Sequence, residues 1–180
     1  WGCIPTKSFL RSAEVLKIIK SSEKYGIKSE LGHVDIREIV KRSRSIAKKL
    51  SSGVEYLLKK NKVVIFDGEA SFKTSKSIVI TSKNNVVKEI SSTNICIASG
   101  GRPREISGVP NSSNVWFYKE ALQVDNIPKK LLIVGSGAIG VEFASFFAQM
   151  GSEVSVLESK PTILPNEDLE VSNFVEKQFL

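Results

Sequence analysis

The architecture of this chain depends on ten residues, Leu131-Leu132-Ile133-Val134-Gly135-Ser136-Gly137-Ala138-Ile139-Gly140. The first four form a short β-rich apolar run, which predicts a buried strand. A helical pattern follows from Ala138 to Met150, and Gly151 predicts where this helix ends. A second strand is expected over 153–158. Strand, helix and strand within about 28 residues make a βαβ unit, so the sequence predicts an α/β fold with a parallel sheet.

The turn between the first strand and the helix has the spacing Gly-x-Gly-x-x-Gly. In this spacing the first glycine permits a tight turn, the second lets the backbone approach a pyrophosphate, and the third lets helix and strand pack closely. The free N–H groups and the positive dipole end of the helix favour a diphosphate. We therefore predict a dinucleotide site made by Gly135, Ser136, Gly137, Ala138, Ile139 and Gly140.

Glu158 is expected to determine which of the two dinucleotides, NAD or NADP, binds at this site. It ends the second strand, 23 positions beyond Gly135. A carboxylate at this place can accept hydrogen bonds from both hydroxyls of the adenosine ribose, but it would repel a 2′-phosphate. The sequence therefore predicts NAD rather than NADP.

The sequence before residue 128 predicts two helices and three strands. The chain opens on a helix, with Pro5 at a tolerated early position. A second helix is expected over 36–60, because Asp35 and Glu38 have the spacing of a capping box. Strands are expected at 63–66, 77–80 and 94–98, and a connecting loop at 100–110. A last helix is expected to begin at Asn166 or Glu167 and to continue to the end of the chain.

Composition narrows the class of protein. Of the 180 residues, 41% are hydrophobic and 25% are charged, which excludes a disordered tail, a collagen-like repeat and a coiled coil. No apolar stretch approaches the roughly 18 residues that span a bilayer. Two cysteines are too few for a secreted disulfide scaffold. We expect a soluble protein of a reducing compartment.

The net charge of +7 raises the alternative of a nucleic-acid-binding module. The excess is N-terminal, and much of it lies on the helix expected over 36–60. Arg37, Lys41, Arg44 and Lys48 would line an outer face of that helix. No aromatic residues interleave with these basic ones, so a solvated face is favoured over phosphate binding.

Cys3 is the first candidate for redox chemistry. A cysteine near a helix N-terminus has its thiolate stabilised by the helix dipole, and Lys7 lies four residues on, on the same face. A buried, inert cysteine remains the alternative on these residues alone. Cys96 lies between Ile95 and Ile97, where a small hydrophobic residue is expected, so we predict that it is inert.

Four motifs in the chain resemble, in order, those of the flavin-dependent pyridine nucleotide-disulfide oxidoreductases, and most closely the dihydrolipoamide dehydrogenase branch of that family. The residues from Trp1 to Lys7 resemble the second half of the redox-disulfide motif, in which two cysteines are separated by four residues. The segment 98–103 resembles the family's Ala-Thr-Gly-x-x-Pro, with Ser99 in place of Thr. The segments 139–146 and 163–168 resemble parts of the NAD domain. The resemblance covers essentially the whole chain.

The resemblance implies a fold and a division into domains. Residues 1–108 would be the C-terminal part of an FAD-binding Rossmann-like domain that carries the redox-cysteine helix. Residues 109–128 would form the connection, and residues 129–180 would begin an NAD-binding Rossmann-like domain. The resemblance also implies a homodimer in the parent protein, located in the cytoplasm of a bacterium or in the mitochondrial matrix.

The resemblance also implies roles for individual residues. Cys3 would be the flavin-proximal cysteine, and Lys7 would sit beside the flavin, paired with Glu142 near the nicotinamide. Other FAD contacts would come from Ala70 and from Ser99, Gly100 and Gly101. The implied reaction is oxidation of dihydrolipoamide, carried on an acyltransferase lipoyl domain, by NAD through a redox disulfide and FAD. Neither a metal nor nucleic acid nor a membrane enters this scheme.

Several parts that the family requires are not in the sequence. The partner cysteine would lie five positions before Cys3, the first flavin-binding glycine loop further upstream, and the His-Glu acid-base pair in a C-terminal domain. His33 matches no catalytic position and is expected at the surface. We therefore expect an internal fragment that is inactive alone. Another disulfide reductase of the same family, or a non-catalytic remnant, is the alternative within this class.

Overall fold

The structure is a computed structural model that describes residues 1–110 and 112–179. The chain divides into two compact units, one made by Trp1–Lys49 with Pro110–Leu180 and the other by Leu50–Val109. None of the helices among the described residues is long and apolar enough to cross a membrane. The division into units does not test the domain boundaries expected from the sequence, which stay a prediction.

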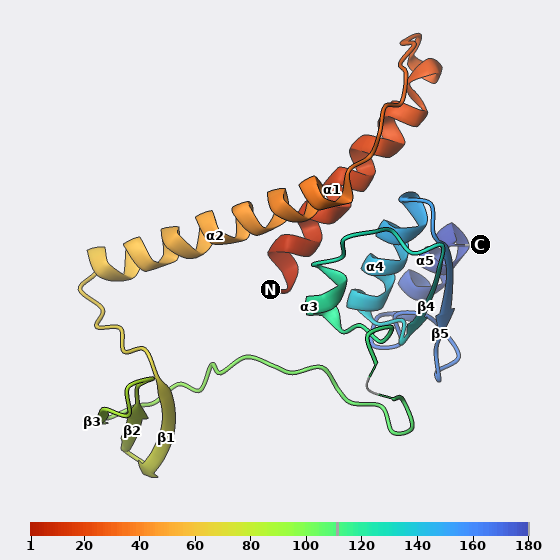
Figure 1. The fold of residues 1–180 in the computed structure, drawn as a ribbon. Helices are drawn as coiled ribbons and strands as arrows, with labels where there is room; N and C mark the ends of the chain where they lie inside the picture. Colours follow the sequence, from red (N-terminus) through yellow and green to blue (C-terminus); the bar gives the residue numbers. More distant parts are fainter. Residues whose placement is uncertain (111, 180) are drawn as a thin grey trace. The chain divides into compact units, whose positions relative to one another are not determined.

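The first unit contains the predicted βαβ motif (Figure 1). Strands β4 (Lys130–Val134) and β5 (Glu153–Leu157) pair in parallel, with Ile133 opposite Val156. Helix α4 (Ala138–Gln149) connects them, and Gly151 follows it with a left-handed φ of 104°. The parallel sheet predicted from the sequence is thus confirmed.

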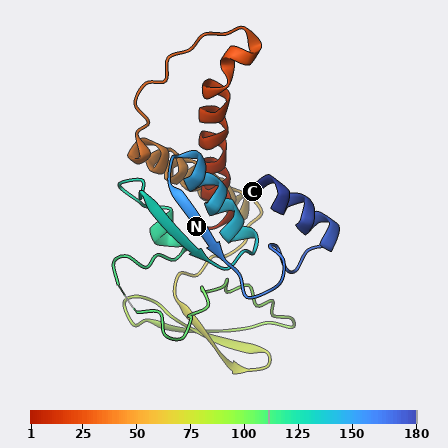
Figure 2. The ribbon, with the colours of Figure 1, turned by 90° about the vertical axis from the view of Figure 1, so that its right-hand side faces the viewer.

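Among the described residues, the first unit contains four helices besides α4, and a one-turn 3-10 helix. α1 (Cys3–Lys20) packs against one side of α4, and β4 and β5 lie on the other (Figures 1 and 2). A one-turn 3-10 helix, η1 (Ser22–Tyr25), follows α1, and α2 (Ile36–Lys60) begins in this unit. Two further helices, α3 (Tyr118–Ala121) and α5 (Leu169–Phe179), complete it. The expected last helix therefore begins two or three residues later than predicted.

Phenylalanine rings form the centre of this unit. Phe9 from α1 and Phe146 from α4 are both buried, and their ring centroids lie 4.6 Å apart. Phe147 meets Phe146 edge to face at 5.1 Å. Leu122, just after α3, closes the same core. Rings of this size contribute most of the apolar area of a small core, so they fix α1 against α4.

Helix α2 begins where Asp35 predicted it. The Oδ1 atom of Asp35 accepts a hydrogen bond of 2.9 Å from the N–H of Arg37, whereas Glu38 pairs with Lys41 rather than completing a capping box. The predicted basic outer face needs one correction. Arg44 is half-buried and its guanidinium lies 3.7 Å from the centroid of the Trp1 ring, so it stacks on an aromatic face instead of being solvated.

The second unit contains a three-stranded antiparallel sheet in the order β1-β2-β3. Its strands are β1 (Glu69–Thr74), β2 (Ser77–Thr81) and β3 (Val87–Ser91). Of the three strands predicted before residue 100, only the one at 77–80 is present. The apolar runs at 63–66 and 94–98 have no regular structure and no strand partner within the described residues, because a strand needs a hydrogen-bonded neighbour as well as apolar residues.

Candidate functional site

The glycine loop leaves β4 through a conformation that favours glycine. Gly135 has a φ of 98°, and its N–H donates to Leu157 O at 2.8 Å, so the loop is tied to the end of β5. A Cβ added at Gly140 would lie 2.0 Å from Gly135 O and 3.4 Å from Ile133 Cγ2. The third glycine is therefore required for α4 to approach β4, as the motif predicts.

The second glycine lies in open space. Gly137 is the N-cap of α4, and no heavy atom lies within 4 Å of the position a Cβ would take. No side chain caps this end of the helix in the described part of the chain. The first N–H groups of a helix have no partner within the helix, and together they attract an anion. The geometry can thus accept a diphosphate at Gly137.

Glu158 lies beside this loop, as predicted, and both of its carboxylate oxygens already have donors. Oε2 accepts from the N–H of Ser136 at 2.9 Å and from its hydroxyl at 2.8 Å. Oε1 accepts from the N–H groups of Ser159 at 2.7 Å and Lys160 at 2.9 Å, and from the Ser159 hydroxyl at 3.3 Å. These bonds, led by the one from Ser136 N–H, lower the pKa of Glu158 from 4.5 to about 2. Glu158 is therefore ionised at neutral pH.

A turn at Leu164, which the sequence did not predict, is hydrogen-bonded to the glycine loop. Leu164 N–H donates to Ser136 O at 2.9 Å, and the Ser172 hydroxyl donates to Leu164 O at 3.0 Å. Leu164 has a left-handed φ of 49°, which is uncommon for a side chain of its size. Since Pro165 follows it and no glycine marks the turn, the sequence carried no local signal for this conformation.

The second candidate group brings Cys3, Lys7 and Glu142 into the same unit. Cys3 is the first residue of α1, is exposed and is not in a disulfide. Lys7, one turn later, pairs with the Glu142 carboxylate from α4, which confirms the expected pair. The hydrogen bond and charge of Glu142 raise the pKa of Lys7, and the charge of Cys3 adds to this. A cation is thus held one turn from the thiol, at the positive end of a helix.

The residues expected to contact FAD lie in the second unit. Ala70 is on β1, opposite Ile80, and Ser99, Gly100 and Gly101 follow in an exposed segment without regular structure. Gly100 has a φ of 80°, and neither it nor Gly101 has an atom within 4 Å of the Cβ position. This open backbone leaves room for a large group. The roles of these residues stay predictions.

Cys96 and His33, the other two residues considered from the sequence, are both exposed. Cys96 is exposed, not packed as a small core residue, because the run 94–98 has no strand neighbour in the described residues. His33 is exposed, as expected.

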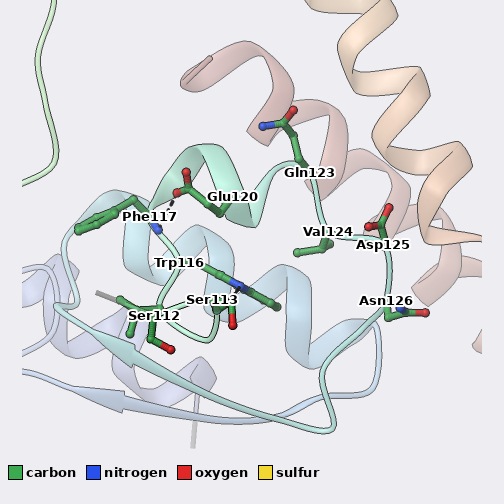
Figure 3. Close-up of a pocket in the computed structure, with 10 residues that line it drawn as sticks. Ser112, Ser113, Trp116, Phe117, Glu120, Gln123, Val124, Asp125 and Asn126 are labelled. Carbon is green, nitrogen blue, oxygen red and sulfur yellow. Dashed lines mark hydrogen bonds between the residues drawn. The ribbon is translucent and has the colours of Figure 1, made fainter. Parts of the chain in front are cut away.

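The structure also contains two cavities that the sequence did not predict. One of about 720 Å³ lies along residues 112–126 in the first unit (Figure 3). Trp116 lines it and donates to Ser113 O at 3.0 Å, and its ring lies tilted with its centroid 6.4 Å from that of Phe147. Glu120 accepts a hydrogen bond from the N–H of Phe117. A second of about 440 Å³ lies between α1, α2 and residues 30–34. None of the residues assigned to chemistry lines either cavity.

Comparison with known proteins gives a consistent result. The family model for pyridine nucleotide-disulphide oxidoreductases matches residues 1–180. The dihydrolipoyl dehydrogenase of Zymomonas mobilis is 45% identical over 180 residues, which cover 99% of this chain and 39% of the relative. The dihydrolipoyl dehydrogenase of Chlorobaculum tepidum is 42% identical over 180 residues, with 99% and 38% covered. The chain thus spans about two fifths of the length of these curated relatives.

Solved structures share the fold. LpdA from Mycobacterium tuberculosis superposes with a TM-score of 0.85 at 24% identity, over 99% of this chain and 39% of that one. RclA from Escherichia coli, a flavoprotein disulfide reductase induced by HOCl, superposes with a TM-score of 0.76 at 27% identity, over 99% and 37%. The first likeness is evidence of fold only.

Proposed function

Because the chain belongs to the pyridine nucleotide-disulphide oxidoreductase family, we propose that it is part of an enzyme that oxidises dihydrolipoamide with NAD, through a redox disulfide and FAD. The observation that supports this most is the pairing of Lys7 with Glu142. It joins the helix that begins at Cys3 to the helix that begins at the glycine loop. The element for thiol chemistry and the element for the dinucleotide are thereby held in one packed unit.

Each residue has a task in this proposal. Cys3 and a cysteine five positions before it would form the disulfide that takes two electrons from dihydrolipoamide. The substrate becomes lipoamide, and its two thiol protons pass to the two reduced cysteines. Lys7, paired with Glu142, would place a positive charge one helical turn from the Cys3 sulfur. The loop from Gly135 to Gly140 would bind the diphosphate of NAD, and Glu158 the adenosine ribose.

The cofactors fit the residues that would hold them. Gly137 leaves open the space that a diphosphate needs, and no atom lies within 4 Å of the Cβ positions of Gly100 and Gly101. Bound FAD would supply the two-electron chemistry that links the thiols to the nicotinamide, which leaves as NADH. The protein contributes position and charge.

Partners and location follow from the same proposal. The enzyme would be a homodimer that receives its substrate on the lipoyl domain of an acyltransferase. It would act in the cytoplasm of a bacterium or in the mitochondrial matrix.

The test uses the full-length protein that contains this chain. NAD reduction by dihydrolipoamide should be rapid, and Cys3→Ser should abolish it. Cys96→Ser is the matched control, because Cys96 is also an exposed free cysteine and has no role in the mechanism. Reduction of glutathione disulfide by NADPH, with no reaction of dihydrolipoamide, would favour another disulfide reductase of the family instead.

A further inference from the structure

Ser136 occupies a variable position of the glycine motif, yet it is one of the most enclosed residues in the chain. Its exposed fraction is 0%. Its hydroxyl and its N–H both donate to Glu158 Oε2, at 2.8 and 2.9 Å, and its carbonyl accepts from Leu164 N–H at 2.9 Å. All the polar groups of Ser136 therefore have protein partners. The direct contact with the dinucleotide that the sequence predicted for this residue would have to replace one of them.

The two oxygens of Glu158 are held differently. Oε2 receives its bonds on the buried side, from Ser136 alone. Oε1 receives its bonds on the exposed side, and the longest of these, at 3.3 Å, comes from the hydroxyl of the exposed residue Ser159. A carboxylate offers about four lone-pair sites, so the five donors already fill it. A ribose hydroxyl can therefore bind Glu158 only if it replaces one of these donors. The Ser159 hydroxyl is the easiest to replace, because its hydrogen bond is the longest of the five.

We infer that Ser136 is a positioning residue that fixes Oε2 of Glu158, so that Oε1 is the oxygen presented to the ribose, and that Ser136 thereby helps set the preference for NAD over NADP. The inference rests on the proposed function, because it concerns the same dinucleotide site. Without the Ser136 hydroxyl, the carboxylate keeps one bond to the loop and can turn away. Its hydrogen bond to a ribose hydroxyl and its repulsion of a 2′-phosphate would both weaken.

Ser172 provides a matched control. It is also buried, with an exposed fraction of 1%, and its hydroxyl donates to Leu164 O at 3.0 Å. Leu164 O keeps a second bond, from Glu167 N–H at 2.9 Å, just as Glu158 Oε2 keeps the bond from Ser136 N–H. Ser136→Ala and Ser172→Ala thus each remove one buried hydroxyl from one acceptor. Only the first acceptor is on Glu158.

The experiment measures the dissociation constants of NAD⁺ and NADP⁺ by calorimetry in the full-length protein and its variants. Ser136→Ala should reduce the ratio of the NADP⁺ constant to the NAD⁺ constant about threefold to tenfold, the effect of a weakened hydrogen bond to a charged group. Ser172→Ala should leave that ratio within about twofold. In a Glu158→Gln background, Ser136→Ala should change the ratio no further, because the partner through which it acts is already altered.

A general loss of structure would weaken both nucleotides together and leave the ratio alone, which would contradict the positioning role. If Ser136→Ala does not fold, Ser159→Ala gives a second test. It should bind NAD⁺ at least as well as the unmodified protein, because it frees a site on Oε1, and weaker binding would overturn the division between the two oxygens. An unmodified protein that prefers NADP⁺ contradicts the proposed function itself. An unmodified protein that prefers NAD⁺, with a Ser136→Ala variant of equal preference, contradicts only the present inference.

Discussion

Gly140→Ala should lower the stability of the folded dinucleotide loop. At most helical positions this change stabilises a protein by about 0.5–1 kcal/mol. Here the new Cβ would lie 2.0 Å from Gly135 O, which is backbone and cannot rotate away. Gly135 is also fixed through its N–H, which donates to Leu157 O. We therefore expect a loss of about 3 kcal/mol, at the upper end of what an overpacked site costs.

Amide hydrogen exchange in the full-length protein would measure this loss of stability at individual residues of the loop. A loss of about 3 kcal/mol corresponds to a protection factor reduced roughly 150-fold at the N–H groups of Gly135 and Val141, which bond to Leu157 O and Gly137 O. Gly53→Ala is the control. Gly53 lies within α2 with no atom within 4 Å of its Cβ position, so this change should stabilise slightly. Unchanged protection in Gly140→Ala would refute the reasoning.

Gly137→Val separates ligand binding from folding. Gly137 has an extended backbone, with φ of −64° and ψ of 176°, and open space at Cβ, so valine should be accommodated with protection intact. Its branched side chain would occupy the space needed by a diphosphate, and the affinities for NAD and NADP should fall together. Unchanged affinities for both nucleotides would show that the diphosphate does not bind at this loop.

Three further outcomes are expected. Glu158→Arg should shift the ratio of kcat/KM values toward NADP by about tenfold or more, because it replaces a repelling charge with a donor to the 2′-phosphate; an unchanged ratio would mean that Glu158 does not bind the ribose. Glu158, with its pKa lowered from 4.5 to about 2, should stabilise the loop fully above pH 4.5 and progressively less as the pH falls toward 2. A protection factor of the Gly135 N–H that stays constant across this window would contradict this. The 180-residue chain with added FAD should form no NADH from dihydrolipoamide, because the partner cysteine of Cys3 and the acid-base pair are not among these residues; measurable NADH would disprove this.

The βαβ unit could be predicted because its signals are local. The apolar run before Gly135, the helical pattern after Gly137 and Gly151 at the helix end each specify their own conformation. Glu158 was found for the same reason, since its place at the end of the second strand puts it at the same sheet edge as the glycine loop. The pair of Lys7 and Glu142, 135 positions apart, came only from the resemblance to a family.

The features that were missed depend on contacts between segments. The strand Glu69–Thr74 is exposed along its whole length, so its residues lack the alternation that marks a half-buried strand. The run 63–66 consists of apolar residues typical of a buried strand, but it has no neighbouring strand to pair with in the described residues. The roles of Ser136 and Leu164 depend on hydrogen bonds to partners more than 20 positions away, and the motif specifies only its glycines.

The central claim is that Cys3 belongs to a redox disulfide, and disulfide mapping tests it most directly. The full-length protein, oxidised and digested without reduction, would be analysed by mass spectrometry for peptides linked through Cys3. We predict a link from Cys3 to a cysteine five positions before it, which disappears after treatment with dihydrolipoamide. A Cys3 that stays a free thiol in the oxidised protein, or a residue other than cysteine at that position, would contradict the account.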